Sequence, residues 1–218
     1  MKPFVIGLTG SIGCGKSYVL RTLMRLGAEG IDADKVAHEV MAPGAGAYEP
    51  IIAAFGREVL GADGAIDRAK LGGRVFGDPA ALAQLEGIVH PAVYAETKRR
   101  VEDSHAPAVA IEAIKLLEAG LSVGLCDEVW VVVCSEAEQL DRLARSRGMT
   151  ADEVRRRRSH QMPPEQMAER ADRIIRTDGT LEDTAAEVLR LWVALGLPLP
   201  TTPEGDAVAG RNDAQTVE

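Results

Sequence analysis

The chain has 218 residues, 46% of them hydrophobic and only 4% aromatic, so it can bury one sizeable core built mostly from aliphatic side chains. Its formal net charge of −8 argues against a general nucleic-acid binder, which needs a basic face to neutralise phosphates. Three cysteines form no disulfide framework and no apolar stretch approaches the roughly 20 residues of a membrane helix, so we expect a cytoplasmic protein that binds neither membranes nor nucleic acid.

The first elements predict a strand, a glycine-rich loop and a helix. Residues 4–8 form a short apolar run that predicts a buried first strand, and glycines follow it. Residues 16–26 have helical spacing, with apolar side chains on one face and Gly27 as a natural end. A second short strand is predicted over 28–31, and the helix after it is broken near Pro43.

The segment up to about residue 105 contains only helical patterns. Turns rich in glycine, aspartate and proline separate these helices, and His90-Pro91 marks one of the breaks. A run of helices inside a strand–helix alternation predicts an inserted helical subdomain. The predicted helices cover residues 48–55, 68–76, 79–89 and 91–102.

Strand–helix alternation resumes after the insertion. We predict strands over 108–112, 128–134 and 173–176, and the Val-rich second one is typical of a strand covered on both faces. Ser135 and Thr150, each with a glutamate three residues later, predict capping boxes that open two helices. Thr180 caps a final helix, whose predicted apolar stripe consists of Leu181, Ala185, Val188, Trp192 and Leu195.

Residues 10–17 read Gly-Ser-Ile-Gly-Cys-Gly-Lys-Ser and match the phosphate-binding pattern G-x-x-x-x-G-K-[ST]. Glycines let the backbone turn so that its N–H groups converge on phosphate oxygens, and the following helix adds its dipole. Lys16 would reach the β- and γ-phosphates of ATP, and the Ser17 hydroxyl would bind Mg²⁺. The flanking strand and helix argue against a chance glycine turn, and no guanine-reading Asn-Lys-x-Asp supports a GTPase.

Together these features predict the α/β class: a three-layer P-loop NTPase fold with a short parallel sheet of about five strands, an inserted helical subdomain and a helical lid. The core would comprise residues 1–40 and 106–197. The helical acceptor-binding insertion would cover about 41–105 and the lid about 148–170. Composition predicts a disordered tail over 198–218.

Two carboxylates, Asp32 and Asp34, follow the second predicted strand, at the edge where open α/β sheets bind ligands. A carboxylate there can accept the proton of an attacking hydroxyl. Either residue could instead cap the next helix. The two roles weigh about equally for Asp32, whereas the catalytic role is favoured for Asp34.

The segment from Arg142 to Arg176 contains ten arginines and only five acidic residues. Guanidinium groups suit phosphate oxygens, and a closing lid would exclude water. A solvated basic surface accounts for most of these arginines. We single out Arg142 as a catalytic and nucleotide-binding residue, and Arg157, with Gln161 one turn on, as substrate-binding. The other lid arginines are expected on the surface: Arg155, Arg156 and Arg158.

Several further residues have a functional and a structural interpretation of similar weight. His90 would contact the acceptor or hold a structural hydrogen bond, and Arg68 would bind a substrate phosphate or form a surface ion pair. Glu112, at the end of the third predicted strand, would hold an Mg²⁺-bound water or the substrate. Trp130 and Trp192 are expected in the core.

Many of these segments resemble the dephospho-CoA kinase family, over nearly the whole chain up to about residue 197. The resemblance implies ATP- and Mg²⁺-dependent phosphorylation of the ribose 3′-hydroxyl of dephospho-CoA, which gives CoA and ADP as the last step of coenzyme A biosynthesis. Asp34 would be the base. The matching segments include residues 6–17, 26–27, 31–34, 63–68, 90–91, 157–161 and 178–179. The implied nucleotide-binding residues are Gly10, Gly13, Cys14, Gly15, Lys16, Ser17, Tyr18, Arg142 and Gly179. The implied substrate-binding residues are Asp34, Arg68, His90, Glu112, Arg157 and Gln161.

Three departures from the family pattern concern how the acceptor and the nucleotide are held. Tyr18 stands where many members have threonine, and Thr177 replaces an asparagine. Residues 112–118 read Glu-Ala-Ile-Lys-Leu-Leu-Glu in place of Asp-Ile-Pro-Leu-Leu-Phe-Glu, so Lys115 takes an apolar position. Two alternatives therefore stay open: a P-loop kinase for another small acceptor, such as a nucleotide or sugar acid, and a nucleotide-binding regulatory protein without transfer activity.

Overall fold

The structure is a computed structural model of the chain that describes residues 2–119, 122–159 and 161–200. Most of the predicted tail therefore lies outside the described residues. Five parallel strands form one sheet in the order β2-β3-β1-β4-β5. The strands are β1 (Phe4–Thr9), β2 (Glu29–Asp32), β3 (Ala108–Glu112), β4 (Glu128–Val133) and β5 (Arg173–Arg176). The predicted α/β class and short parallel sheet are confirmed.

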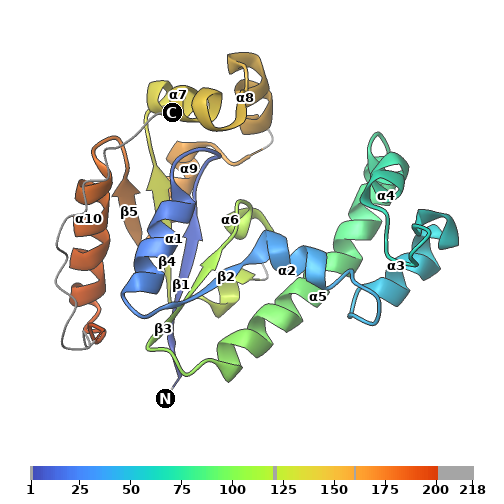
Figure 1. The fold of residues 1–218 in the computed structure, drawn as a ribbon, viewed down its shortest axis with the longest axis horizontal. Helices are drawn as coiled ribbons and strands as arrows, with labels where there is room; N and C mark the ends of the chain where they lie inside the picture. Colours follow the sequence, from blue (N-terminus) through green and yellow to red (C-terminus); the bar gives the residue numbers. More distant parts are fainter. Residues whose placement is uncertain (1, 120–121, 160, 201–218) are drawn as a thin grey trace, which may run out of the picture.

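Helices cover both faces of the sheet and extend beyond its edge (Figure 1). The α-helices are α1 (Lys16–Arg25), α2 (Ala33–Glu39), α3 (Tyr48–Phe55), α4 (Arg68–Val75), α5 (Pro79–Asp103), α6 (Leu116–Ala119), α7 (Glu136–Arg147), α8 (Ala151–Arg158), α9 (Pro164–Glu169) and α10 (Leu181–Ala194). Two short 3₁₀ helices are η1 (Arg57–Val59) and η2 (Ser122–Leu125). No helix of the described part combines the length and apolarity that crossing a membrane requires.

Alternating side chains of the central strands separate the two faces of the sheet. In β4, Trp130 and Val132 pack with α1 and α10, whereas Val129 and Val131 pack with α6 and α9. Both faces are fully buried, as the Val-rich sequence of this strand predicts for a parallel sheet. Trp130 and Trp192 are fully buried core residues, which confirms their predicted place.

The final helix follows its predicted apolar stripe except at its first residue. Val188 and Trp192 are fully buried, and Thr180 forms the predicted cap as part of a capping box with Asp183. Leu181 is 58% exposed, so its inclusion in the buried stripe was wrong. The helix has only just begun at this residue, and the side chain lines the large cavity described below instead of meeting the sheet.

The predicted break at His90-Pro91 is wrong, because α5 runs through it as one helix of 25 residues. Proline lacks only its own N–H and crowds the preceding turn, so a helix can continue through it at the loss of one hydrogen bond. Tertiary packing holds both halves. The C-terminal half places Val93 and Val101 in the same buried cluster as Val5 of β1.

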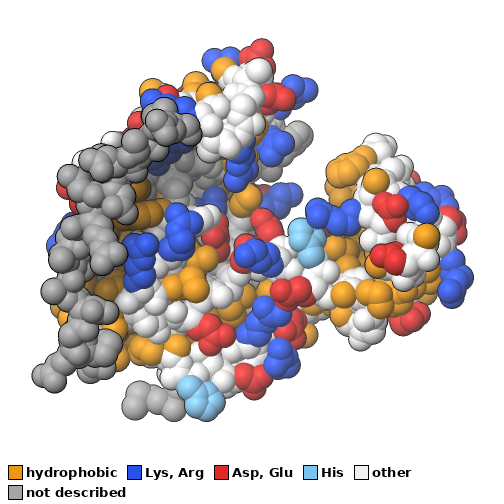
Figure 2. All heavy atoms as spheres, viewed as in Figure 1, with side chains coloured by type: hydrophobic (Ala, Val, Ile, Leu, Met, Phe, Trp, Pro, Cys, Tyr) orange, Lys and Arg blue, Asp and Glu red, His pale blue; other side chains and the backbone are white. Residues whose placement is uncertain are grey.

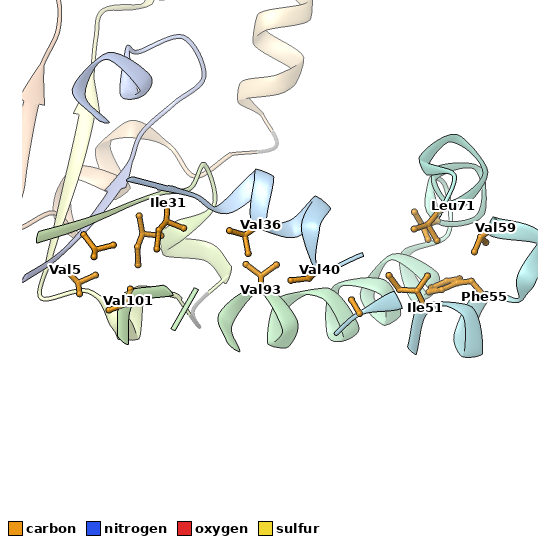
Figure 3. Packing of buried hydrophobic residues seen from close by; sticks show 14 residues of the cluster. Val5, Ile31, Val36, Val40, Ile51, Phe55, Val59, Leu71, Val93 and Val101 are labelled. Atoms are coloured by element: carbon orange, nitrogen blue, oxygen red, sulfur yellow. The ribbon is translucent and has the colours of Figure 1, made fainter. Parts of the chain in front are cut away.

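One continuous apolar cluster connects the sheet with α2, α3, α4 and α5 (Figure 3). Val36 and Val40 of α2 face Val93 of α5 in its middle, and Ile51 and Phe55 of α3 lie at its far end (Figure 3). The helices of residues 41–105 are thus attached to the core by shared packing. The division into core, insertion and lid stays a prediction.

The charged surface of α5 yields a prediction about stability and pH. Glu96 accepts hydrogen bonds from Arg99 and from Arg100, whose Nε lies 2.8 Å from Oε1, and Arg100 also pairs with Glu39 of α2. The hydrogen bond from Arg99, then that from Arg100, lowers the pKa of Glu96 from 4.5 to about 2. A carboxylate with a depressed folded pKa stabilises the fold above its unfolded pKa, and this contribution is lost as the pH falls towards 2.

We expect Glu96→Gln to lower the free energy of unfolding by about 1 kcal/mol at pH 7. Urea denaturation should show the difference from wild type shrinking as the pH falls from 4.5 towards 2. Glu102→Gln is the matched control on the same helix, because Glu102 is 64% exposed and only 3.8 Å from Lys98 in a weak pair. Equal losses in the two variants, or a loss at Glu96 that does not depend on pH, would contradict the prediction.

Candidate active site

The glycine-rich loop connects β1 to α1 as the sequence predicts. Gly13 and Gly15 have positive φ angles of 79° and 86°, which glycine adopts without strain, and Gly15 is the N-cap of α1. Gly10 has a φ of 146° and lies against the carbonyl of Val132 in β4. The loop thus packs on the central strand and presents the N-terminus of α1, where backbone dipoles favour anions.

Lys16 lies buried beneath this loop. Its Nζ donates hydrogen bonds to the carbonyl oxygens of Gly10 (2.8 Å) and Ser11 (3.2 Å). Burial lowers the pKa of Lys16, and the nearby Glu112 carboxylate opposes that shift. The ammonium group is therefore held against the loop by two carbonyl contacts, which it would exchange for phosphate contacts when a nucleotide binds.

Carboxylates from two neighbouring strands meet at the carboxyl edge of the sheet. Asp32 of β2 pairs in register with Glu112 of β3. The Asp32 side chain accepts a hydrogen bond from the Lys35 N–H (3.1 Å) and caps α2, which establishes its predicted capping role. Asp34 lies exposed in the first turn of α2. The start of this helix thus uses Asp32 as its cap, and the catalytic role of Asp34 stays a prediction.

Glu112 has an environment different from that of the two aspartates. Burial raises its pKa, while the Lys16 ammonium and a hydrogen bond with Ser17 lower it. The carboxyl group thus lies beside both the lysine and the serine of the phosphate loop. The family pattern has an aspartate at this position, and the glutamate of this chain likewise places a carboxyl group beside the phosphate loop.

Arg142 of α7 is fixed by a network that sequence analysis did not anticipate. Its Nη1 donates to Thr177 Oγ1 (3.1 Å), its Nη2 donates to the Thr177 carbonyl, and its Nε donates to Glu138 (2.9 Å). The Thr177 hydroxyl in turn donates to the carbonyl of Cys14 (2.9 Å). Thr177, which replaces the family's asparagine, is buried and connects the arginine with the phosphate loop.

The capping box predicted at Ser135 forms only in part. Ser135 accepts a hydrogen bond from the Glu138 N–H, but its own N–H donates to Asp178 instead of Glu138. The Glu138 carboxylate binds Arg142 instead. The box predicted at Thr150 is complete. Asp178, 43 positions away, thus takes the place of Glu138 as acceptor for the Ser135 N–H. The spacing of residues near Ser135 does not reveal this distant partner.

A cavity of about 950 Å³ opens between the phosphate loop, helix α7 and the start of α10. Figure 1 places α7, with α8 beside it, above the carboxyl ends of the strands. Figure 2 shows a notch between this part and the part with α3 and α4, with Lys and Arg side chains along it. The predicted site residues that line the cavity are Gly13, Gly15, Lys16, Ser17, Tyr18, Asp34, Glu112, Arg142 and Gly179.

A second cavity of about 330 Å³ continues from the first along α2 and α5. Asp34, Ala113 and Ile114 line both cavities. The second cavity is lined mainly by apolar side chains, with His90 and Lys115 as its basic groups. The structure thus brings His90 together with Asp34, although they are far apart in sequence.

Other predicted site residues lie away from the two cavities. Arg68 and Arg157 are exposed and line neither of them. Gln161 accepts a hydrogen bond from the Ile12 N–H (3.2 Å), so it contacts the phosphate loop instead. Gly10 and Cys14 belong to the phosphate loop but line neither cavity, and Cys14 is buried. Their expected roles in binding stay predictions.

The arginines of the lid segment divide differently from the prediction. Arg158, expected on the surface, is 28% exposed and pairs with Glu136 at 3.1 Å. Arg155 and Arg156 are exposed as expected. Three arginines that sequence reasoning did not select line the large cavity: Arg21, Arg145 and Arg147. Helical spacing could have identified two of them, because residues three or four apart lie on the same face of a helix. Arg145 follows Arg142 by three residues, and Arg21 follows Ser17 by four.

The donor groups of the cavity fit a magnesium ion that is held partly by phosphate. Among the described residues, no three His, Cys, Asp or Glu side chains gather to hold a metal ion by themselves. Mg²⁺ normally keeps several waters and binds through one or two protein oxygens together with substrate phosphates. The Ser17 hydroxyl with Glu112 beside it provides that kind of partial site.

Three features define a P-loop kinase: the strand, phosphate loop and helix, the parallel sheet with β1 between β3 and β4, and an arginine connected to the loop through Thr177. A family model described as dephospho-CoA kinase matches residues 4–183. A dephospho-CoA kinase of Geobacter metallireducens is 44% identical over 191 residues, which cover 86% of this chain and 94% of the relative. The chain belongs to the dephospho-CoA kinase family.

One solved structure supports this assignment, and a second has the same fold. A dephospho-CoA kinase from Campylobacter jejuni matches with a TM-score of 0.65 and 27% identity, covering 88% of this chain and 98% of that chain. The Thermus thermophilus protein TT1252 matches with a TM-score of 0.77 and 31% identity, covering 89% of this chain and 99% of that chain. Fold and sequence thus lead to the same family.

Proposed function

We propose that this chain transfers the γ-phosphoryl group of ATP to the ribose 3′-hydroxyl of dephospho-CoA, giving CoA and ADP. The observation that carries the proposal is the position of Asp34, which lines both the large cavity at the phosphate loop and the smaller apolar one. A donor phosphate in the first cavity and an acceptor hydroxyl at the mouth of the second would meet at this carboxylate. In-line transfer between two bound substrates requires such a shared boundary.

On the donor side, the chain's own groups would bind and neutralise the triphosphate. The N–H groups of the phosphate loop and Lys16 would bind its oxygens, and Arg142, fixed by Thr177 and Glu138, would face the charge that develops during transfer. Ser17 and Glu112 would hold Mg²⁺, which neutralises phosphate charge when bound. The lid, about residues 148–170, would exclude water.

On the acceptor side, Asp34 would orient the attacking hydroxyl and accept its proton. The apolar cavity offers His90 and Lys115 as cationic or hydrogen-bonding groups for a polyanionic acceptor. The helical insertion, about residues 41–105, would hold the remainder of that molecule. A cytoplasmic location, where free thiols stay reduced, agrees with the three free cysteines.

The test is ADP release from Mg-ATP across a panel of acceptors: dephospho-CoA, nucleoside monophosphates and sugar acids. We expect acceleration by dephospho-CoA alone, with CoA as the product. An analogue that lacks the 3′-hydroxyl should leave ADP release at its basal rate. If only another acceptor accelerates ADP release, that molecule is the substrate instead of dephospho-CoA. If no acceptor accelerates ADP release, the chain is a nucleotide-binding protein without transfer activity.

A further inference from the structure

Two cysteines distant in sequence meet beneath the phosphate loop. Cys14 lies between the positive-φ glycines of the loop, and Cys134 follows β4 directly. Their Sγ atoms are 2.7 Å apart, although 120 positions separate them in the chain. Both are free thiols, as is the third cysteine, Cys126.

The two sulfur atoms have unequal surroundings. The Cys134 thiol donates to Cys14, and this contact, supported by the charges of Lys16 and Arg142, lowers the pKa of Cys14 against the effect of burial. The same hydrogen bond, together with burial, raises the pKa of Cys134. Cys14 is therefore the better nucleophile and Cys134 the proton donor. Burial raises the pKa of Cys126 to about 12, so that thiol stays protonated.

A small cavity adjoins the pair. It measures about 20 Å³, which is enough for one water-sized molecule. Its lining is partly polar and includes both cysteines together with Ser11, Gln139 and Arg158. A peroxide molecule is of this size class and can form hydrogen bonds with such groups. Larger disulfide reagents do not fit.

We propose that Cys14 and Cys134 form a reversible disulfide in the presence of hydrogen peroxide, with Cys14 as the oxidised residue and Cys134 as the residue that resolves it. The Cys14 thiolate attacks one peroxide oxygen, the O–O bond breaks, and a sulfenic acid and hydroxide form. Cys134 then attacks the Cys14 sulfur, and the S–O bond breaks with release of water. In total, two thiols lose two electrons and two protons, and one peroxide becomes two water molecules.

Resolution by Cys134 protects the phosphate loop. Without a partner, a sulfenic acid can be oxidised further to a sulfinic acid, which thiols do not reduce. A sulfinate at Cys14 would add a fixed negative charge below the loop, whose carbonyl at the same residue is bonded to Thr177. A disulfide requires only a small approach of the sulfurs and leaves no charge.

The experiment exposes the reduced full-length protein to hydrogen peroxide and compares four forms: wild type, Cys134→Ser, Cys134→Ala and Cys126→Ser. Thermal melts under reducing conditions first establish that the variants fold. In wild type and Cys126→Ser, we expect a mass lower by about 2 Da, a peptide that joins Cys14 to Cys134, and full reversal by dithiothreitol. In both Cys134 variants, we expect a mass higher by about 32 Da on Cys14 that dithiothreitol does not reverse.

Turnover provides a second readout. After peroxide and then dithiothreitol, wild type should regain its starting rate, whereas the Cys134 variants should remain at least about tenfold below theirs, because a charge stays near the phosphate site. A wild-type Cys14 that stays reduced, a disulfide through Cys126, or full recovery of the Cys134 variants would each overturn the proposal. The mass readout is independent of the acceptor and hence of the proposed reaction.

Discussion

Asp34→Asn is expected to lower kcat with dephospho-CoA by roughly 10²- to 10⁴-fold and to leave ATP binding nearly unchanged. The amide keeps the size of the carboxylate but cannot accept a proton from the acceptor hydroxyl. Asp34 is exposed and lies in the first turn of α2, so the substitution removes no core contact. The measurement is steady-state turnover together with the dissociation constant of ATP by titration calorimetry.

Asp32→Asn is the matched control, because Asp32 lines the same large cavity and asparagine is an equally good helix cap. We expect this variant to retain most of its turnover and its stability. If Asp32→Asn loses turnover while Asp34→Asn keeps it, the base is Asp32. Near-normal turnover in both would remove both aspartates from proton transfer.

Gly10→Ala is expected to lower the free energy of unfolding by roughly 3 kcal/mol and to weaken ATP binding. A Cβ at this position would lie 2.2 Å from the carbonyl oxygen of Val132, and the φ of 146° belongs to the region that favours glycine. Val132 belongs to β4, which is bonded to strands on both sides and cannot move away cheaply. Either the loop or the strand must shift.

Gly44→Ala separates the two causes of this expected loss. Gly44 also has a positive φ, 81°, but a Cβ there would meet nothing within 4 Å. It should therefore lose only about 1 kcal/mol, the cost of the backbone conformation alone. Urea denaturation of both variants gives the comparison. Similar losses at the two positions would mean that the close approach to β4 does not matter.

The local parts of the fold follow from the sequence, because they depend on short-range patterns. The phosphate loop, the helix after it and the Val-rich strand β4 are specified by adjacent residues. The continuity of α5 through Pro91 is not, because packing of Val93 and Val101 against the sheet outweighs the cost of one proline. Long-range packing of this kind has no signature within a short window.

The site shows the same division between near and distant contacts. The shared location of Lys16, Ser17 and Asp34 at one cavity could be predicted from their spacing relative to predicted strands and helices. The fixing of Arg142 by Thr177 depends on a contact across 35 positions, and only the structure reveals it. The exposure of Arg157 was equally inaccessible, since four successive arginines point to all sides of α8 and the packing of Val154 decides which side faces inward.

The unbroken α5 limits how the two cavities can close on each other. At 25 residues it forms a rod about 37 Å long that joins the packing around α3 and α4 to the core beneath β1. A hinge at Pro91 would have let the helical insertion, about residues 41–105, close over an acceptor without moving the sheet. A rod packed at both ends transmits any tilt of the insertion to the sheet. On the opposite side, the small cluster of Val154, Ile12 and Leu143 holds α8 to the loop, so we expect the lower-cost closing movement there.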